Sequence, residues 1–381
     1  MIKTVPYWRL SSFYFFYFAS LGALVPYWGL YLQSLNFDAR AIGELMAIIM
    51  VTKIIAPYLW SWIADHTGRS MLIIRLAALM SVLTFAGVFL NSGFWWLALV
   101  MMSFSFFWNA SLPQFEAVTM NHLGQDTHRY SVIRLWGSLG FILSVLLLGQ
   151  WLDSEDYSRV PQLVIVLYIG IALSSFLVPQ SKGQPHAKEH LGIFSVIRQP
   201  TVIALLLVCF LAQMSHGPYY TFYSIYLKQY GYDSSTIGGF WALGVLAEII
   251  VFLYMQRLMP RFGPQRLLMV ALLLTALRWY LIGHYVELWQ MLLLAQLLHA
   301  ASFGLYHAVA IELFHRLFKG KLQGRGQALY SSISFGAGGA LGSYLSGLLW
   351  DQLSPVFIFN LAALVALLGF FISWRFIRLE S

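Results

Sequence analysis

The chain has 381 residues, of which 59% are hydrophobic and only 10% are charged. A soluble domain usually carries about 25% charged residues, so this composition excludes an ordinary water-soluble protein and predicts a surface that faces lipid. The net charge of +8 would suit a nucleic-acid partner. The basic residues follow a membrane topology instead, and we predict no nucleic-acid binding.

Twelve mostly apolar stretches are long enough to cross a bilayer, which requires about 20 residues each. The first is too long for the apolar core of a signal peptide, so we expect it to remain as a span. The predicted spans are 8–33, 40–63, 71–90, 94–121, 133–151, 161–178, 201–229, 236–257, 265–283, 288–315, 325–349 and 354–378. The sequence therefore predicts an all-α polytopic membrane protein with twelve transmembrane helices.

Lys and Arg residues lie mainly on one side of these spans. If both termini are cytoplasmic, 17 of the 23 basic residues lie inside and only Arg40, Arg159 and Lys228 lie outside. This is the distribution that the positive-inside rule describes. We therefore expect a multi-pass protein of the bacterial inner membrane with both termini in the cytoplasm.

The second half of the chain repeats the first. At an offset of 195 residues, the segment 27–44 matches 222–239, and Lys53 takes the place of Glu248. Asp153 matches Asp351 at an offset of 198. The repeat predicts an N-terminal half at 1–180, a cytoplasmic linker at 181–198 and a C-terminal half at 199–381. Two related halves around a central cavity favour alternating access of a small solute to the two sides.

Five of the ionisable residues in the predicted spans are not assigned to either side of the membrane and fall at membrane depth, where a charge is costly and usually functional. They are Lys53, Glu116, Arg134, Glu248 and Arg278. Glu116 and Arg134 can pair on neighbouring spans, either as part of a substrate site or as a structural clamp. An arginine fork also suits a carboxylate, and Arg278 is a second candidate for that role.

Other residues are candidates for proton coupling or for contacts with the solute. Lys53 and Glu248 hold equivalent places in the two halves and either pair with each other or pair elsewhere. Glu248 is either the leading proton carrier or a member of a fixed ion pair. His216 is either a proton-coupling residue or a hydrogen-bonded structural histidine. Trp136 and Tyr220 are candidate contacts for an aromatic solute, although most such rings face lipid or other helices.

The loop after the second span carries a recognisable motif. It reads SWIADHTGRS at 61–70, with Asp65, Gly68 and Arg69 in the positions that the major facilitator superfamily uses there. Ser61 and Ser70 depart from that pattern. The chain is similar to this superfamily along essentially its whole length, which implies that the loop takes part in the conformational change.

A narrower resemblance is to the lactose permease and phenylpropionate permease group of proton symporters. It rests on the segment 13–32, on the spacing of 18 residues between Glu116 and Arg134, and on SHGPYYTFYSIYLKQYGY at 215–232. The resemblance implies substrate contacts for Glu116 and Arg134, and a substrate and proton network at Glu248, Arg278 and His299. The tenth span has Gln296, His299 and Ser302 where the lactose permease has Lys, His and Glu, so the proton-carrying carboxylate of that permease is absent.

The sequence shows no metal-ligand spacing, no nucleophile motif and no ATP-binding motif, so we expect no enzyme activity, no metal and no cofactor. Either an ion gradient or the solute's own gradient would then drive transport. Among ions, protons are favoured and sodium is left open. The leading solute is an aromatic carboxylate such as 3-phenylpropionate; a sugar, a nucleoside or efflux remain alternatives. A sensor would need a soluble signalling domain, and an enzyme would need a catalytic constellation. The sequence shows neither, so we do not favour these two classes. We expect a monomer that binds a small solute and a proton.

Overall fold

The computed structural model describes residues 5–153, 156–180 and 193–377, without the side chains of Asp65 and Lys321. Throughout these residues the ordered segments are helices, and none is a strand. Eleven helical stretches within them are long and apolar enough to cross a membrane. The remaining predicted span, 325–349, lies within a continuous helical stretch from 323 to 350. Its many Gly and Ser residues lower its hydropathy, and it completes the twelve-helix arrangement.

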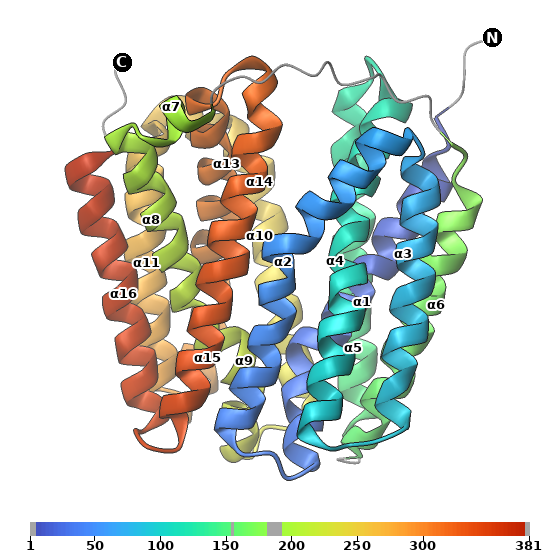
Figure 1. The fold of residues 1–381 in the computed structure, drawn as a ribbon. Helices are drawn as coiled ribbons and strands as arrows, with labels where there is room; N and C mark the ends of the chain where they lie inside the picture. Colours follow the sequence, from blue (N-terminus) through green and yellow to red (C-terminus); the bar gives the residue numbers. More distant parts are fainter. Residues whose placement is uncertain (1–4, 154–155, 181–192, 378–381) are drawn as a thin grey trace.

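The N-terminal half contains six long helices, which lie together on one side of the molecule (Figure 1). They are α1 (Tyr7–Ser34), α2 (Ala39–Thr67), α3 (Ser70–Phe85), α4 (Phe94–Leu123), α5 (Tyr130–Trp151) and α6 (Val160–Leu177). Asp38 begins α2 by accepting a hydrogen bond from the Ala41 amide at 2.8 Å, as an N-cap does.

The short helix α7 (Ile193–Ile197) lies in the predicted linker and precedes the C-terminal half; 181–192 are outside the described residues. The six membrane-crossing stretches of this half occupy the other side of the molecule (Figure 1). They are α8 (Pro200–Ser215) with α9 (Gly217–Gln229), α10 (Ser234–Phe262), α11 (Pro264–His284), α12 (Trp289–Leu297) with α13 (Tyr306–Leu317), α14 (Gln323–Ser331) with α15 (Gly339–Trp350), and α16 (Pro355–Phe376).

Three of these stretches are interrupted in ways that hydropathy does not predict. The seventh breaks at His216, between α8 and α9. The tenth and eleventh contain π-helical turns, η4 (Ala300–Leu305) and η6 (Ser332–Gly338). Wide turns of this kind occur frequently at functional sites because they change the direction in which side chains leave the helix.

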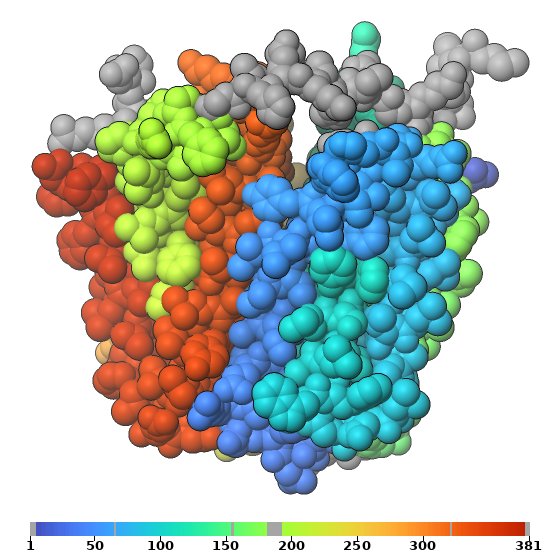
Figure 2. Space-filling view, in the orientation of Figure 1, coloured from blue at the N-terminus to red at the C-terminus, as the bar shows by residue number. Residues whose placement is uncertain are grey.

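The two halves meet most closely at the face opposite the start of α1 and the end of α16. We call this the far face, and the face where α1 begins and α16 ends the terminal face (Figure 1). At the far face α2 packs on α15 and α5 packs on α10. A Cβ added to Gly43 would lie 2.6 Å from the Gly347 Cα, so only glycine allows this approach. In the space-filling view the halves touch below and separate above (Figure 2).

The outer surface is apolar, as a membrane protein requires. Large side chains such as Trp95, Leu253 and Leu83 are exposed by 83%, 75% and 65%. In water, an apolar surface of this extent would drive association. These side chains therefore face the hydrocarbon of a bilayer, and the chain is a multi-pass membrane protein.

Candidate functional site

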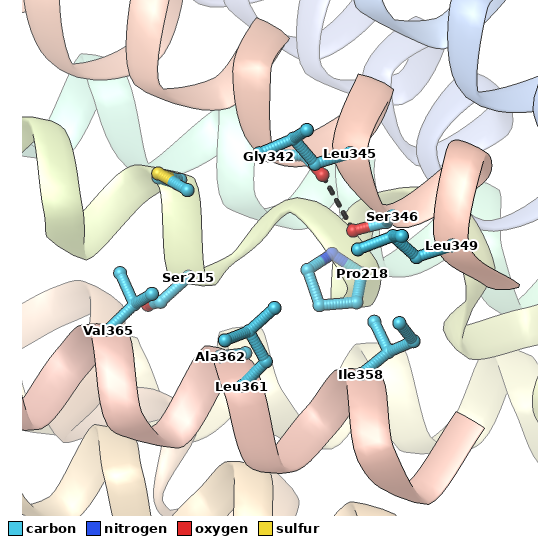
Figure 3. A pocket seen from close by; sticks show the side chains of 11 residues that line it. Ser215, Pro218, Gly342, Leu345, Ser346, Leu349, Ile358, Leu361, Ala362 and Val365 are labelled. Carbon is cyan, nitrogen blue, oxygen red and sulfur yellow. Dashed lines mark hydrogen bonds between the residues drawn. The ribbon is translucent and has the colours of Figure 1, made fainter. Parts of the chain in front are cut away.

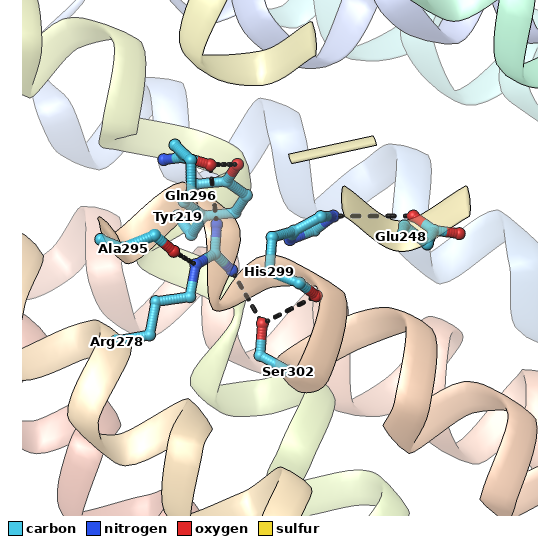
Figure 4. A network of polar contacts seen from close by, with 7 residues as sticks. All are labelled: Tyr219, Glu248, Arg278, Ala295, Gln296, His299 and Ser302. Atoms are coloured by element: carbon cyan, nitrogen blue, oxygen red, sulfur yellow. Dashed lines mark hydrogen bonds and ion pairs between the residues drawn. The ribbon is translucent and has the colours of Figure 1, made fainter. Parts of the chain in front are cut away.

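The centre of the C-terminal half contains a buried arginine, Arg278 of α11 (Figure 4). Its Nε donates to the Ala295 carbonyl at 3.0 Å, one terminal nitrogen donates to Ser302 Oγ at 3.1 Å, and the other donates to Gln296 Oε1 at 3.2 Å. All three acceptors are neutral. Within the described residues no carboxylate lies within 4.0 Å of this guanidinium, so its charge is hydrogen-bonded but not neutralised.

Aromatic rings and one amide hold Arg278 in place. The guanidinium carbon lies 4.0 Å from the Tyr219 ring centroid and 4.7 Å from that of Trp279, which favours a cation. Gln296 also accepts a hydrogen bond from the Tyr219 hydroxyl at 3.0 Å and donates to the Tyr223 hydroxyl at 2.6 Å. Gln296 is therefore the hub that joins Arg278 to α9.

Glu248 of α10 and His299 lie beside this network. His299 Nε2 is 3.8 Å from Glu248 Oε2, and both side chains are largely buried. Gly304, in the turn η4, leaves room for the carboxylate, because a Cβ there would lie 2.9 Å from Glu248 Cγ. The second ring nitrogen of His299, Nδ1, has no hydrogen-bond partner in the described structure. A small movement would bring the two groups within hydrogen-bond distance of each other.

The N-terminal half contributes a second polar group, on α4 and α5. Glu116 accepts a hydrogen bond from the Tyr130 hydroxyl at 3.2 Å. The Arg134 guanidinium lies over the Phe18 ring, 3.6 Å from its centroid, and near Tyr14 at 5.8 Å. The distance between Glu116 and Arg134 exceeds that of an ion pair, so these residues are electrostatic neighbours and not a closed clamp.

Arg134 also links the two halves. It interacts electrostatically with Glu116 in its own half and with Glu248 in the other. The structure thus brings Arg134, Glu116 and Glu248 toward a common centre. Arg278 lies behind this centre and is completely buried.

Lys53 of α2 lies apart from these carboxylates. Its ammonium makes no ion pair or hydrogen bond with any described residue, and of the two alternatives for Lys53 and Glu248 the structure does not show the direct pair. The neighbouring Thr52 instead joins a buried polar cluster: Asn109 Nδ2 donates to Thr52 Oγ1, which donates to Ser105, both at 2.9 Å. Lys53 is therefore a partly buried cation without a protein counter-charge among the described residues.

Two further predicted site residues, His216 and Trp136, lie in different surroundings. His216 is fully buried at the α8–α9 break, with Nδ1 2.7 Å from the Ala212 carbonyl oxygen and its ring near Tyr220. Trp136 does not join the site: its Nε1 donates to the Tyr7 hydroxyl at 2.9 Å, and its ring contacts the exposed Trp8. Two residues from Arg134 on a helix, it points to almost the opposite side.

The loop motif ends α2. Gly68 has a φ of 63°, a left-handed conformation that favours glycine at the end of a helix, and its amide donates to the Ala64 carbonyl. Arg69 is exposed on the terminal face. The side chain of Asp65 lies outside the described structure.

A small pocket elsewhere is not the candidate site. It lies between the α8–α9 break, α15 and α16, and its lining is almost entirely apolar (Figure 3). The Ser346 hydroxyl in its wall donates to the Gly342 carbonyl at 2.6 Å. None of the predicted site residues lines this pocket.

Sequence reasoning missed several members of the network. Tyr223 and Tyr130 were not predicted, and Gln296 and Ser302 were noted only as departures from a pattern. The spacing of Gln296, His299 and Ser302 by three residues was the available indication, because residues three apart share one side of a helix.

Comparison with known proteins decides the family. The model of the MFS_1 like family matches residues 7–361. The chain belongs to this family. Its predicted membership of the major facilitator superfamily is thereby confirmed, and its function is that of a transporter and not an enzyme.

The relatives of this chain include transporters of different solutes. The probable 3-phenylpropionic acid transporter of Escherichia coli is 30% identical over 95% of this chain and 96% of its own length. The maltose permease of Geobacillus stearothermophilus is 28% identical over 91% of this chain and 89% of its own length. Among solved structures, the nucleoside transporter NupG has a TM-score of 0.85, with 15% identity over 98% of this chain and 99% of that one. This last likeness shows the fold alone.

Proposed function

We propose that this chain imports a small aromatic carboxylate, such as 3-phenylpropionate, together with a proton. It would act as a monomer in the bacterial inner membrane by alternating access, with the terminal face toward the cytoplasm. The proposed substrate class draws on the relative that is named as a probable 3-phenylpropionic acid transporter. The proposed halves are 1–180 and 199–381, joined by the linker.

The observation that carries the proposal is an excess of positive charge at membrane depth. Three cations, Lys53, Arg134 and Arg278, accompany two carboxylates, Glu116 and Glu248, and in the described structure none of these cations forms an ion pair with a carboxylate. Uncompensated charge in a low-dielectric region is costly. A monoanionic solute would remove the excess until the coupled proton binds.

The rings near Arg134 suit the other end of such a solute. Phe18 and Tyr14 flank the guanidinium, and Tyr220 lies in the facing half next to His216. An aromatic ring can stack on one of these while its carboxylate meets Arg134. Trp136 has no part in this proposal, because its contacts are with Tyr7 and Trp8.

Glu248 and His299 are the proposed proton-coupling pair. Their separation of 3.8 Å allows the proton to be shared when the halves move, and Arg134 is the cation that acts on Glu248 across the interface. Binding the solute carboxylate at Arg134 would weaken the hold of this arginine on Glu248. The solute carboxylate and Glu248 would thus compete for Arg134, and this competition links solute binding to the proton-coupling pair.

A sugar or a nucleoside is the second candidate, and one observation favours it. Glu116 with the Tyr130 hydroxyl forms a hydrogen-bonding pair suited to a ligand rich in hydroxyl groups. The likeness to a maltose permease points in the same direction.

Uptake into proteoliposomes tests the proposal. Labelled 3-phenylpropionate is offered with and without an inward proton gradient, with excess unlabelled 3-phenylpropanamide, maltose or uridine as competitors. We expect accumulation driven by the gradient and no competition by the neutral amide. Absence of 3-phenylpropionate uptake, together with uptake of labelled maltose or uridine in a parallel assay, would overturn the proposed substrate. Accumulation without a gradient would overturn proton coupling.

A further inference from the structure

The far face carries a pair of contacts in which each half of the protein holds a helix of the other. Asp153 follows α5 in the N-terminal half, and its Oδ1 accepts a hydrogen bond from the Ser235 amide of α10 at 2.9 Å. Its Oδ2 also accepts from the Ser235 hydroxyl. Asp351 follows α15 in the C-terminal half, and its Oδ2 accepts from the Ala39 amide of α2 at 3.2 Å.

The two contacts are equivalent under the internal repeat. Asp153 and Asp351 match at the offset of 198 residues, and the helices that they hold, α10 and α2, begin at matching positions. Both helices already have an N-cap from their own half, since Asp233 accepts from the Thr236 amide at 2.7 Å and Asp38 from the Ala41 amide. The aspartates from the opposite half therefore satisfy amides that the helix's own cap leaves unpaired.

We propose that Asp153 and Asp351 are reciprocal latches that stabilise the closed far face and so set the balance between the two states of the transport cycle. Each carboxylate also meets the positive end of a helix dipole, which strengthens the contact. The partners belong to opposite halves. Any rocking motion that opens the far face must therefore break both contacts, whereas the caps made by Asp38 and Asp233 survive it.

The surroundings explain why the latches would be reversible. Asp153 and Asp351 are exposed, so water can replace the carboxylates at the freed amides. Between the latches, the halves touch through small residues: a Cβ on Gly149 would lie 2.6 Å from the Ser234 carbonyl oxygen. In the same region the Tyr27 hydroxyl, which donates to the Val145 carbonyl of its own half at 2.7 Å, lies 3.4 Å from the Ser234 carbonyl oxygen of the other half. Among the contacts of the described residues between the latches, this close approach is made by neutral groups, and the two carboxylates supply charge beside it.

The inference does not depend on the solute or on proton coupling, and its test needs neither. Spin labels are placed at Gln33 and Glu287, which are exposed at the far face in opposite halves, in a Cys209→Ala background. The distance distribution between them is measured by pulsed electron resonance. Asp153→Ala combined with Asp351→Ala is compared with the parent and with Asp156→Ala, an acid that contacts Ser158 and Arg159 of its own half.

We expect the double variant to raise the ratio of long to short distances by roughly tenfold or more, and each single variant by a smaller and similar factor. Asp156→Ala should leave the distribution unchanged. The Asn variants at both positions keep the side-chain shape and should shift the distribution in the same direction by less, which serves if the Ala variants do not fold. A distribution identical to that of the parent in folded double variants would overturn the proposal.

Discussion

Gln296 should control both the stability of the C-terminal half and the charge at its centre. Its side chain accepts hydrogen bonds from Arg278 and from the Tyr219 hydroxyl and donates one to the Tyr223 hydroxyl, and it is completely buried. Gln296→Leu keeps the volume but leaves these three groups without their partner. Each unsatisfied buried polar group costs about 1–3 kcal/mol, so loss of three partners should cost about 3–9 kcal/mol of stability.

Gln296→Glu should behave differently, because a carboxylate keeps both acceptor sites and the Tyr223 hydroxyl can donate to it. The attraction to Arg278 offsets the cost of burying the new charge, and we expect stability within about 1 kcal/mol of the parent. The new carboxylate, however, cancels the excess positive charge at membrane depth. At a separation of about 10 Å and an effective dielectric constant of about 20, the lost attraction to an anion is roughly 1.7 kcal/mol, or more than tenfold in affinity.

Thermal unfolding of the purified protein, followed by tryptophan fluorescence, measures the first effect, and equilibrium binding of 3-phenylpropionate measures the second. Gln114→Leu is a matched control, since Gln114 makes one side-chain hydrogen bond, to Ser61 at 2.6 Å. We expect Gln296→Leu to unfold several degrees below this control. Equal unfolding temperatures would refute the role of Gln296 as a hub, and full affinity in Gln296→Glu would refute the role of the charge excess.

Three further results are expected. Arg134→Ala should weaken binding of 3-phenylpropionate at least tenfold while Trp136→Phe, which alters a residue outside the site, leaves the affinity unchanged; equal effects in a binding titration would remove Arg134 from the site. Glu248→Gln should abolish accumulation driven by a proton gradient and spare exchange of solute, and retained accumulation in proteoliposomes would place the proton elsewhere. Gly347→Val should prevent closure of the far face, because a Cβ there would lie 2.6 Å from both the Gly43 Cα and the Ala39 carbonyl oxygen, and far-face labels that report an unchanged closed state would contradict this packing.

Several features of this protein are local properties of the sequence. The run of apolar residues that makes a span is contiguous, so the spans could be predicted to within a few residues at most ends. The Lys and Arg distribution predicts an orientation in the same way. The internal repeat aligns Asp153 with Asp351 and Lys53 with Glu248, and this alignment needs only the order of residues along the chain. The cost of charge in lipid then singles out the five ionisable residues of the spans.

Which of those residues meet was decided only by the packing of the helices. The direction in which a side chain points depends on how its helix is rotated against the neighbouring helices. It also depends on interruptions such as η4 and the break at His216, and hydropathy records neither effect. For this reason Lys53 stayed apart from Glu248. Trp136 is a different case, because the helical period alone turns it away from Arg134, two residues earlier on α5. Arg278 donates hydrogen bonds to neutral acceptors on another helix, and Asp153 and Asp351 accept hydrogen bonds from the opposite half. These contacts join separate segments of the chain. They exist because the two halves fold against each other, and no local pattern in the sequence specifies them.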